Sequence, residues 1–434
     1  MFVKRRLKQQ ELALIKALAL DDIKIVAEPC RYYPLESLGT ILGITDIDNH
    51  GLFGVELLFD QQLRGISSTY TLERDARSGH FYFNKVTNVQ GQDGKPVTLT
   101  IDSDLQFLAY QELKDAVELF HAKEGGVIIV DSVTGEIRAC ASWPDFNPNE
   151  SDHIVQEYTK SYPFTQCYEV GSVIKVFLAM AALEAGVVTP DELIDCENKP
   201  TTYVDSMKIN TVVESVRGVI SFAEVIEKSN NIGVAKIALR LGSKLYDYYQ
   251  RFGFARKTAV NFPGEQTGFI TDPAHWSKRS VVSLSFGYEI RTTMVQLAQA
   301  FSLIAQAGYP VTLSLVKQIQ PVQVRTPVFS KKTLEQIKDI LTKTVLEGTA
   351  RRARIKGYRV MGKTGTANLI EHGHYNEHKN LFTFSGIIEK DNYRRVIVTY
   401  LKEIESKTPQ HASTVAVPLF DHVAEKMLIH DKII

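Results

Sequence analysis

Two pairs of short apolar segments near opposite ends of the chain limit the fold more than any other feature. Gly126–Val130 and Glu136–Ser142 are joined by a polar turn, and Leu381–Ile388 and Arg395–Leu401 form a second such pair. Each pair is typical of an antiparallel hairpin. The sequence between them has mostly helical periodicity, for example over Phe222–Leu241. This order predicts an α+β fold whose antiparallel sheet joins distant parts of the chain, and no β-α-β alternation supports a doubly wound sheet.

The segment Gly91–Pro96 is rich in residues that break helices and strands, and it predicts a domain boundary. The expected domains are residues 1–96, a smaller N-terminal part, and residues 97–434. Of the 434 residues, 44% are hydrophobic and 23% are charged, which indicates a globular protein. Fifty Lys and Arg residues balance fifty Asp and Glu residues, so no overall positive field favours nucleic acid as a partner.

The first 20 residues predict an amphipathic helix, because Leu7, Leu14, Ile15 and Leu18 fall on one helical face. We expect this helix to pack against its own domain, and a helix lying on a membrane surface is the alternative. The sequence has no run of 18 apolar residues, so we expect neither a membrane-spanning helix nor a signal peptide.

Ser172 and Lys175 stand three positions apart at the start of an apolar run that ends at Gly186, and this spacing places both on one face of a buried helix. A serine becomes a strong nucleophile when a base removes its proton. A lysine can be that base if burial or a second cation lowers its pKa. The alternative interpretation of Ser172 is a serine that caps the helix. Ser314 and Lys317 repeat the spacing in a strand-like segment, and we interpret that copy as coincidence.

Two more motifs carry groups that could act in the same pocket. The only S-x-N pattern, Ser229 to Asn231, can present a hydroxyl and a carboxamide, although a polar loop that caps the next helix is the alternative. The only K-T-G pattern comprises Lys363, Thr364 and Gly365. Its cation and hydroxyl can bind a carboxylate, and glycine in a strand lets another backbone approach closely. The spacing of a phosphate-binding loop is absent.

The three motifs follow one another at separations of 57 and 134 residues, in the order of the serine acyl transferases that recognise penicillin. The chain resembles class B penicillin-binding proteins, and it is most similar to the division-type (FtsI-like) peptidoglycan D,D-transpeptidases. Val170 stands where relatives often have proline, and Gln410–Ser413 replaces a usual glycine pair. Further segments that carry the resemblance are Arg31–Pro34, Gly51–Glu56, Leu63–Gly65, Thr100–Asp102, Phe262–Glu265, Ser285–Tyr288 and Gly348–Thr349.

The resemblance implies a penicillin-binding transpeptidase fold, an antiparallel sheet flanked by helices, with residues 1–96 forming part of a pedestal. It implies that Ser172 attacks the penultimate D-alanine of a peptidoglycan stem peptide, and that an amine of a neighbouring stem then takes the acyl group. Lys175 would accept the proton of the serine. The other implied roles are proton delivery by Ser229 and Lys363, substrate binding by Asn231, Thr364, Gly365 and Thr366, and an oxyanion hole from the backbone N–H groups of Ser172 and Thr366.

The resemblance also implies that β-lactams acylate the serine, that no metal or other cofactor is needed, and that a glycosyltransferase and division proteins are partners. It places the enzyme at the periplasmic face of the inner membrane, and we expect this sequence to lack the family's N-terminal anchor. Two alternatives remain. One is a serine β-lactamase or D,D-carboxypeptidase, although the sequence identifies no glutamate that would hold a hydrolytic water. The other is a non-catalytic relative that binds β-lactams, and the three intact motifs argue against it.

Overall fold

The computed structural model describes most of the chain. The described residues are 3–20, 23–74, 81–150, 156–205, 207–210, 218–318, 326–404 and 410–432.

A five-stranded antiparallel sheet forms the centre of the molecule, in the order β11-β12-β13-β3-β4. The two hairpins predicted from the sequence are β3–β4 and β12–β13, and they meet where β13 pairs with β3. The K-T-G strand, β11, forms one edge of the sheet. This arrangement confirms the predicted α+β class. The strands are β3 (Ala122–Asp131), β4 (Ile137–Trp143), β11 (Arg359–Glu371), β12 (His374–Lys390) and β13 (Tyr393–Ile404).

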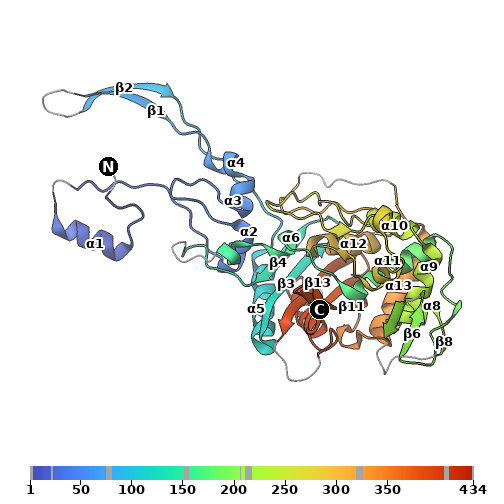
Figure 1. Cartoon of the computed structure of the whole chain (residues 1–434). Helices are drawn as coiled ribbons and strands as arrows, with labels where there is room; N and C mark the ends of the chain where they lie inside the picture. The colour runs from blue at the N-terminus through green and yellow to red at the C-terminus, as the bar shows by residue number, and fades with distance from the viewer. Residues whose placement is uncertain are drawn as a thin grey trace.

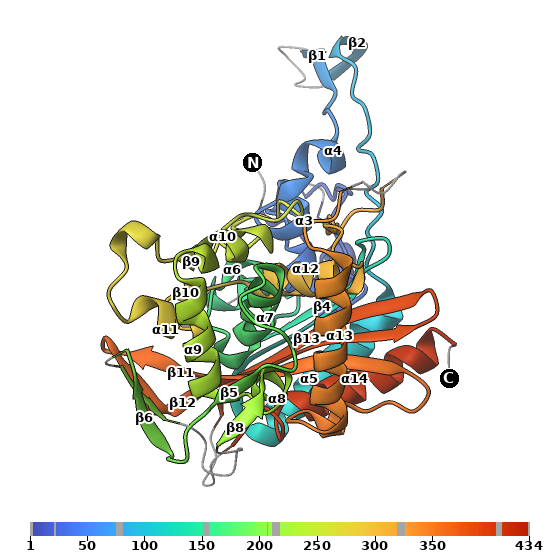
Figure 2. The same cartoon turned by 90° about the vertical axis from the view of Figure 1, so that its right-hand side faces the viewer.

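Both faces of this sheet are buried, which explains why β3 is apolar at nearly every position. Val127 and Ile129 point into one hydrophobic cluster, and Ile128 and Val130 point into the other. Helices α5 (Ser103–Phe120) and α14 (Ala416–His430) cover the first face. The second face carries α7 (Lys175–Glu184) and the surrounding helices, so the sheet lies between two helical layers (Figure 2).

The helical layer on the second face contains the segments that carry the first two motifs. Its helices are α6 (Tyr162–Thr165), α7 (Lys175–Glu184), α8 (Phe222–Glu227), α9 (Asn231–Leu241), α10 (Lys244–Arg251), α11 (Ser280–Phe286), α12 (Met294–Ala305) and α13 (Lys331–Leu346). Three short ribbons accompany them: β5 (Leu193–Asp195) with β8 (Val219–Ser221), β6 (Thr201–Val204) with β7 (Met207–Asn210), and β9 (Phe269–Ile270) with β10 (Ile290–Arg291). Single 3₁₀ turns are η3 (Gln156–Thr159), η4 (Gly171–Ile174), η5 (Pro273–His275) and η6 (Arg351–Ala353).

The N-terminal part extends away from this body (Figure 1). Leu38, Ile41 and Val55 nevertheless belong to the main hydrophobic cluster, so the part nearest to the body packs into it. The boundary at residue 96 stays a prediction. The elements of this part are α1 (Gln9–Leu18), η1 (Glu36–Leu38), α2 (Gly39–Leu42), α3 (Gly54–Leu58), α4 (Asp60–Arg64), β1 (Thr69–Arg74) and β2 (Phe81–Val89).

Helix α1 forms within the predicted range, but the expectation that it packs against its own domain is wrong. None of its residues is buried, and the side chains of Leu14 and Leu18 are 66% and 64% exposed. The helix stands apart from the body (Figure 1). Of the helices in the described residues, none is long and apolar enough to cross a membrane.

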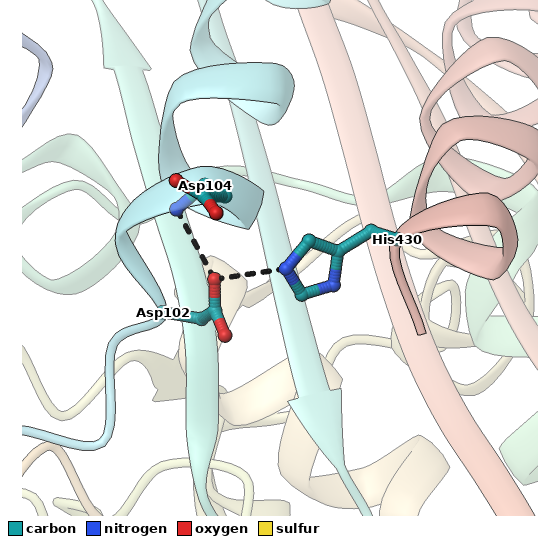
Figure 3. A group of neighbouring side chains, drawn as sticks. All are labelled: Asp102, Asp104 and His430. Atoms are coloured by element: carbon teal, nitrogen blue, oxygen red, sulfur yellow. Dashed lines mark hydrogen bonds and ion pairs between the residues drawn. The ribbon is translucent and has the colours of Figure 1, made fainter. Parts of the chain in front are cut away.

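A polar cluster fastens the C-terminal helix to the start of α5 (Figure 3). Asp102 caps α5 by accepting hydrogen bonds from the backbone N–H groups of Asp104 and Leu105, and it pairs with Arg138 at 2.9 Å. His430, at the end of α14, lies 3.2 Å from the same carboxylate. The carboxylate oxygens of Asp102 are therefore already engaged in structural contacts, so the cluster gives no support to a metal site.

The packing of α14 on the sheet predicts the effect of removing one aromatic ring. Phe420 is fully buried, and its ring lies 4.7 Å from that of Phe384 in an edge-to-face arrangement. We expect Phe420→Ala to lower the free energy of unfolding by about 3–5 kcal/mol, because it leaves a cavity beneath α14. Urea denaturation measures this loss. Leu119→Ala, which truncates a side chain that is 73% exposed, should change the same quantity by less than about 0.5 kcal/mol. If Phe420→Ala lowered the free energy of unfolding as little as Leu119→Ala, that result would contradict the packing described for α14.

Candidate active site

The first motif lies where a 3₁₀ turn leads into a buried helix. Ser172 belongs to η4, and Lys175 is the first residue of α7. The helix is buried from Lys175 to Leu183, as its apolar sequence predicts. The serine itself is partly exposed, whereas the lysine side chain is completely buried. The turn therefore presents a partly exposed hydroxyl next to a buried amine.

The second motif lies in a break between two helices. The helical periodicity of Phe222–Leu241 takes the form of two helices, α8 and α9, and the S-x-N motif lies in the turn between them. Ser229 has a φ of 57°, in the left-handed region, which ends α8. Asn230 then caps α9 by accepting a hydrogen bond from the backbone N–H of Gly233 at 2.9 Å. The break turns the side chains of the motif toward α7.

The amine of Lys175 is held by this turn. Its Nζ donates hydrogen bonds to the backbone carbonyl of Ser229 at 2.8 Å and to Oδ1 of Asn231 at 2.6 Å, and it lies 3.2 Å from Oγ of Ser229. The Ser172 hydroxyl makes no hydrogen bond to another residue in the described part of the chain. The structure thus joins the first two motifs through Lys175.

The third motif supplies a second amine from the edge strand β11. Lys363 is completely buried, and its Nζ donates hydrogen bonds to Oγ of Ser229 at 3.0 Å and to the carbonyl of Thr364 at 3.2 Å. The Ser229 hydroxyl therefore lies between the amines of Lys363 and Lys175. All the hydrogen-bond partners found for these two amines among the described residues are uncharged oxygens.

This environment disfavours positive charge on both lysines. Burial lowers the pKa of Lys363 to about 7. Burial, and then the neighbouring Lys363, hold the pKa of Lys175 well below its ordinary range. A neutral lysine can accept a proton from a serine, whereas a protonated lysine cannot. The site therefore meets the electrostatic condition under which Lys175 could serve as a general base.

Two glycines allow η4 to lie directly against β11. Gly171 has a φ of 55°, and a Cβ atom placed on it would lie 2.3 Å from the carbonyl oxygen of Thr366. A Cβ atom on Gly365 would lie 2.3 Å from the carbonyl oxygen of Val170. Both approaches are too close for a side chain. The backbone of the K-T-G strand can therefore approach Ser172 only because glycine stands at these two positions.

The two threonines of the third motif differ in their surroundings. Thr366 is exposed, whereas Thr364 is 8% exposed and its hydroxyl lies 3.0 Å from that of Thr349. Sequence analysis did not assign a site role to Thr349, although the Gly348–Thr349 pair was part of the resemblance. Its contact with Thr364 could not be inferred from spacing, because it depends on how α13 ends beside β11.

The second copy of the S-x-x-K pattern lies elsewhere. Ser314 is held in extended backbone, where it bridges Glu136. Its hydroxyl donates a hydrogen bond to the carbonyl of Val316 at 2.6 Å. This serine thus has a local structural partner and no contact with the lysines of the site, and it provides a matched control for Ser172.

The contact between η4 and β11 predicts different effects of two glycine substitutions. Gly171→Ala should abolish acylation of the protein by benzylpenicillin, because the new Cβ atom would push η4 away from Thr366. Gly186 also has a positive φ, 67°, but a Cβ atom there would have no neighbour within 4 Å. Gly186→Ala should therefore cost about 1 kcal/mol of stability and leave acylation nearly unchanged. Intact-mass spectrometry measures acylation, and equal acylation of the two variants would contradict the assigned contact.

Comparison with known proteins agrees with the residues brought together here. Residues 125–425 match the family described as "Penicillin binding protein transpeptidase domain". The probable peptidoglycan D,D-transpeptidase PenA of Neisseria gonorrhoeae is 31% identical over 93% of this chain and 69% of its own length. The peptidoglycan D,D-transpeptidase FtsI of Escherichia coli K12 is 30% identical over 96% and 70%. Stage V sporulation protein D of Bacillus subtilis is 30% identical over 98% and 68%.

Solved structures show the same fold. Penicillin-binding protein 3 of Mycobacterium tuberculosis, in complex with aztreonam, superposes with a TM-score of 0.78 and 27% identity over 93% of this chain and 90% of the other. The transpeptidase domain of penicillin-binding protein 3 of Burkholderia pseudomallei gives a TM-score of 0.69 and 30% identity over 77% and 97%. The chain belongs to the class B penicillin-binding proteins, the family of the peptidoglycan D,D-transpeptidases.

Proposed function

We propose that this protein is a peptidoglycan D,D-transpeptidase that works through an acyl-enzyme on Ser172. The observation that carries the proposal is the position of the Ser229 hydroxyl, within 3.2 Å of Lys175 Nζ and 3.0 Å of Lys363 Nζ. It connects the three motifs into one system of proton donors and acceptors beside the nucleophile. Membership of a family whose relatives are named D,D-transpeptidases supports the same reaction.

In the first half-reaction, Oγ of Ser172 attacks the carbonyl carbon of the penultimate D-alanine. Its proton passes to the neutral amine of Lys175. The bond from this carbon to the terminal D-alanine nitrogen then breaks, and this nitrogen takes a proton from the Ser229 hydroxyl, which Lys363 can replenish. In the second half-reaction, an amine of a neighbouring stem attacks the ester, and Lys175 returns a proton to Oγ. The attacking amine gives up one proton through the Ser229 hydroxyl to Lys363, which restores the proton that Lys363 lost in the first half-reaction.

The remaining residues of the motifs would hold the substrate. The carboxamide of Asn231 would bind a peptide amide, and Thr364 and Thr366, with Gly365 between them, would bind the terminal carboxylate beside Lys363. The backbone N–H groups of Ser172 and Thr366 would stabilise the developing oxyanion, a contribution of about 3–4 kcal/mol per donor. The close approach of η4 to β11 at Gly171 supports this arrangement, because it brings these two backbone segments together.

β-Lactams would acylate the same serine. Complexes of Mycobacterium tuberculosis penicillin-binding protein 3 with aztreonam and with ampicillin, whose fold this chain shares, support this part of the proposal. A β-lactamase or D,D-carboxypeptidase would use the same serine but would release the acyl group to water. The lifetime of the acyl-enzyme separates these functions.

We place the reaction in septal wall synthesis at the periplasmic face of the inner membrane, from the likeness to FtsI of Escherichia coli. Peptidoglycan stem peptides are then the substrate, and a glycosyltransferase and other division proteins are the expected partners. Residues 1–96 would serve as part of a pedestal for the transpeptidase domain, residues 97–434. The extension of the N-terminal elements away from the body supports this division (Figure 1).

Intact-mass spectrometry after incubation with benzylpenicillin tests the proposed nucleophile. The wild-type protein should gain the mass of one penicillin and keep it for hours. Ser172→Ala should gain none, because the variant lacks the attacking oxygen. Ser314→Ala should behave like the wild type, since Ser314 lies outside the site.

Three results would contradict the proposal. Labelling of Ser172→Ala would disprove the nucleophile. A short-lived adduct with accumulating penicilloate would indicate a β-lactamase. No adduct on the folded wild-type protein would indicate a non-catalytic relative.

A further inference from the structure

The short ribbon β6–β7 touches the active site through one hydrogen bond. The side-chain amide of Asn231 donates from Nδ2 to the backbone carbonyl of Asn210, the last residue of β7, at 3.0 Å. Oδ1 of the same amide accepts the hydrogen bond from Lys175 at 2.6 Å. The carboxamide is thus held at both ends, by the ribbon on one side and by the lysine on the other.

The orientation of this carboxamide determines what Lys175 can do. A neutral lysine amine has two N–H donors and one lone pair. The Ser229 carbonyl and Asn231 Oδ1 accept both donors, which leaves the lone pair for a hydroxyl, either that of Ser229 at 3.2 Å or that of the nucleophile. If the carboxamide were turned by 180°, Nδ2 would face Lys175 and would donate to that lone pair. The turned orientation would therefore block the base.

The Asn210 carbonyl favours the productive orientation because it can only accept a hydrogen bond. Oδ1 turned toward it would bring two acceptors together, whereas Nδ2 satisfies it. Asn231 keeps a second Nδ2 proton in this orientation, which is available for a substrate amide. The ribbon thus selects the amide orientation without occupying every donor of Asn231.

One contact ties the two strands of the ribbon together, and another attaches the ribbon to α9. The Thr201 hydroxyl donates a hydrogen bond to Oδ1 of Asn210 at 3.0 Å across the open end of the ribbon. On its apolar side, Val204 and Ile209 are buried in a small cluster with Ile232 of α9. The ribbon is therefore attached to the same helix that begins at Asn231.

We propose that β6–β7 is a positioning element: the Asn210 carbonyl fixes the Asn231 carboxamide so that the lone pair of Lys175 stays available to the nucleophile. Thr201 acts through Asn210 and is a positioning residue, not a catalytic one. The inference rests on the proposed function, because it assigns Lys175 the role of base.

Thr201→Val tests this role, since it removes the hydroxyl and keeps the shape of the side chain. The matched control is Thr202→Val, the same substitution one residue along β6, where the side chain points to the other face of the ribbon. Acylation rates are measured with benzylpenicillin and with 6-aminopenicillanic acid, which lacks the side-chain amide. We expect Thr201→Val to be acylated about three- to fivefold more slowly by both compounds, the effect of about one neutral hydrogen bond. Thr202→Val should match the wild type, and Thr201→Ser should restore the rate.

The two compounds separate a role in orienting Lys175 from a role in binding substrate. Slower acylation of Thr201→Val by benzylpenicillin alone would mean that the ribbon acts on the substrate amide, and would overturn the inference. Equal rates for Thr201→Val and Thr202→Val would overturn it as well. Both results leave the proposed function intact, whereas a wild-type protein that is not acylated at Ser172 would overturn the proposed function itself.

Discussion

The site depends on the burial of two lysine amines around one serine hydroxyl. Lys175 and Lys363 are completely buried, and uncharged oxygens are the partners that the described residues offer them. A carboxylate beside either amine would stabilise its charge and make Lys175 a poor base. The structure instead combines burial with a second amine, and both lower the pKa of Lys175. The cost of burying these groups must be met by the packing around them.

That packing explains why the fold requires so many distant segments. Helix α7 carries Lys175 and is buried along most of its length, so its surroundings exclude water from the amine. Lys363 comes from the edge strand of a sheet that is covered on both faces. Gly171 and Gly365 let η4, the turn that leads into α7, touch β11 at backbone distance. The same close packing that dehydrates the lysines also brings Ser172 next to the K-T-G strand.

Sequence reasoning predicted the parts of this arrangement that side-chain type and spacing encode. The two hairpins, the buried helix after Ser172 and the three motifs all leave such a pattern. It also predicted a turn or capping loop at the S-x-N motif, but not the positive φ of Ser229 that separates α8 from α9.

Sequence reasoning also could not predict the contact of Thr349 with Thr364 or that of the Asn210 carbonyl with Asn231. The first depends on tertiary packing. The second is made by a backbone carbonyl, which every residue type has. The helix at the N-terminus formed where expected, but its amphipathic pattern did not reveal that the apolar face would be exposed.

The protonation state of the two lysines tests the account most directly. Lysine labelled with ¹³C at the ε-carbon reports the titration of each amine by NMR, and Lys175→Met and Lys363→Met assign the two signals. The account predicts that Lys363 titrates near pH 7 and that Lys175 also titrates well below the ordinary lysine value of about 10.4. As the pH rises, both amines should then lose their protons before the exposed lysines do. Titration of Lys175 together with the exposed lysines would contradict the claim that burial makes it a base.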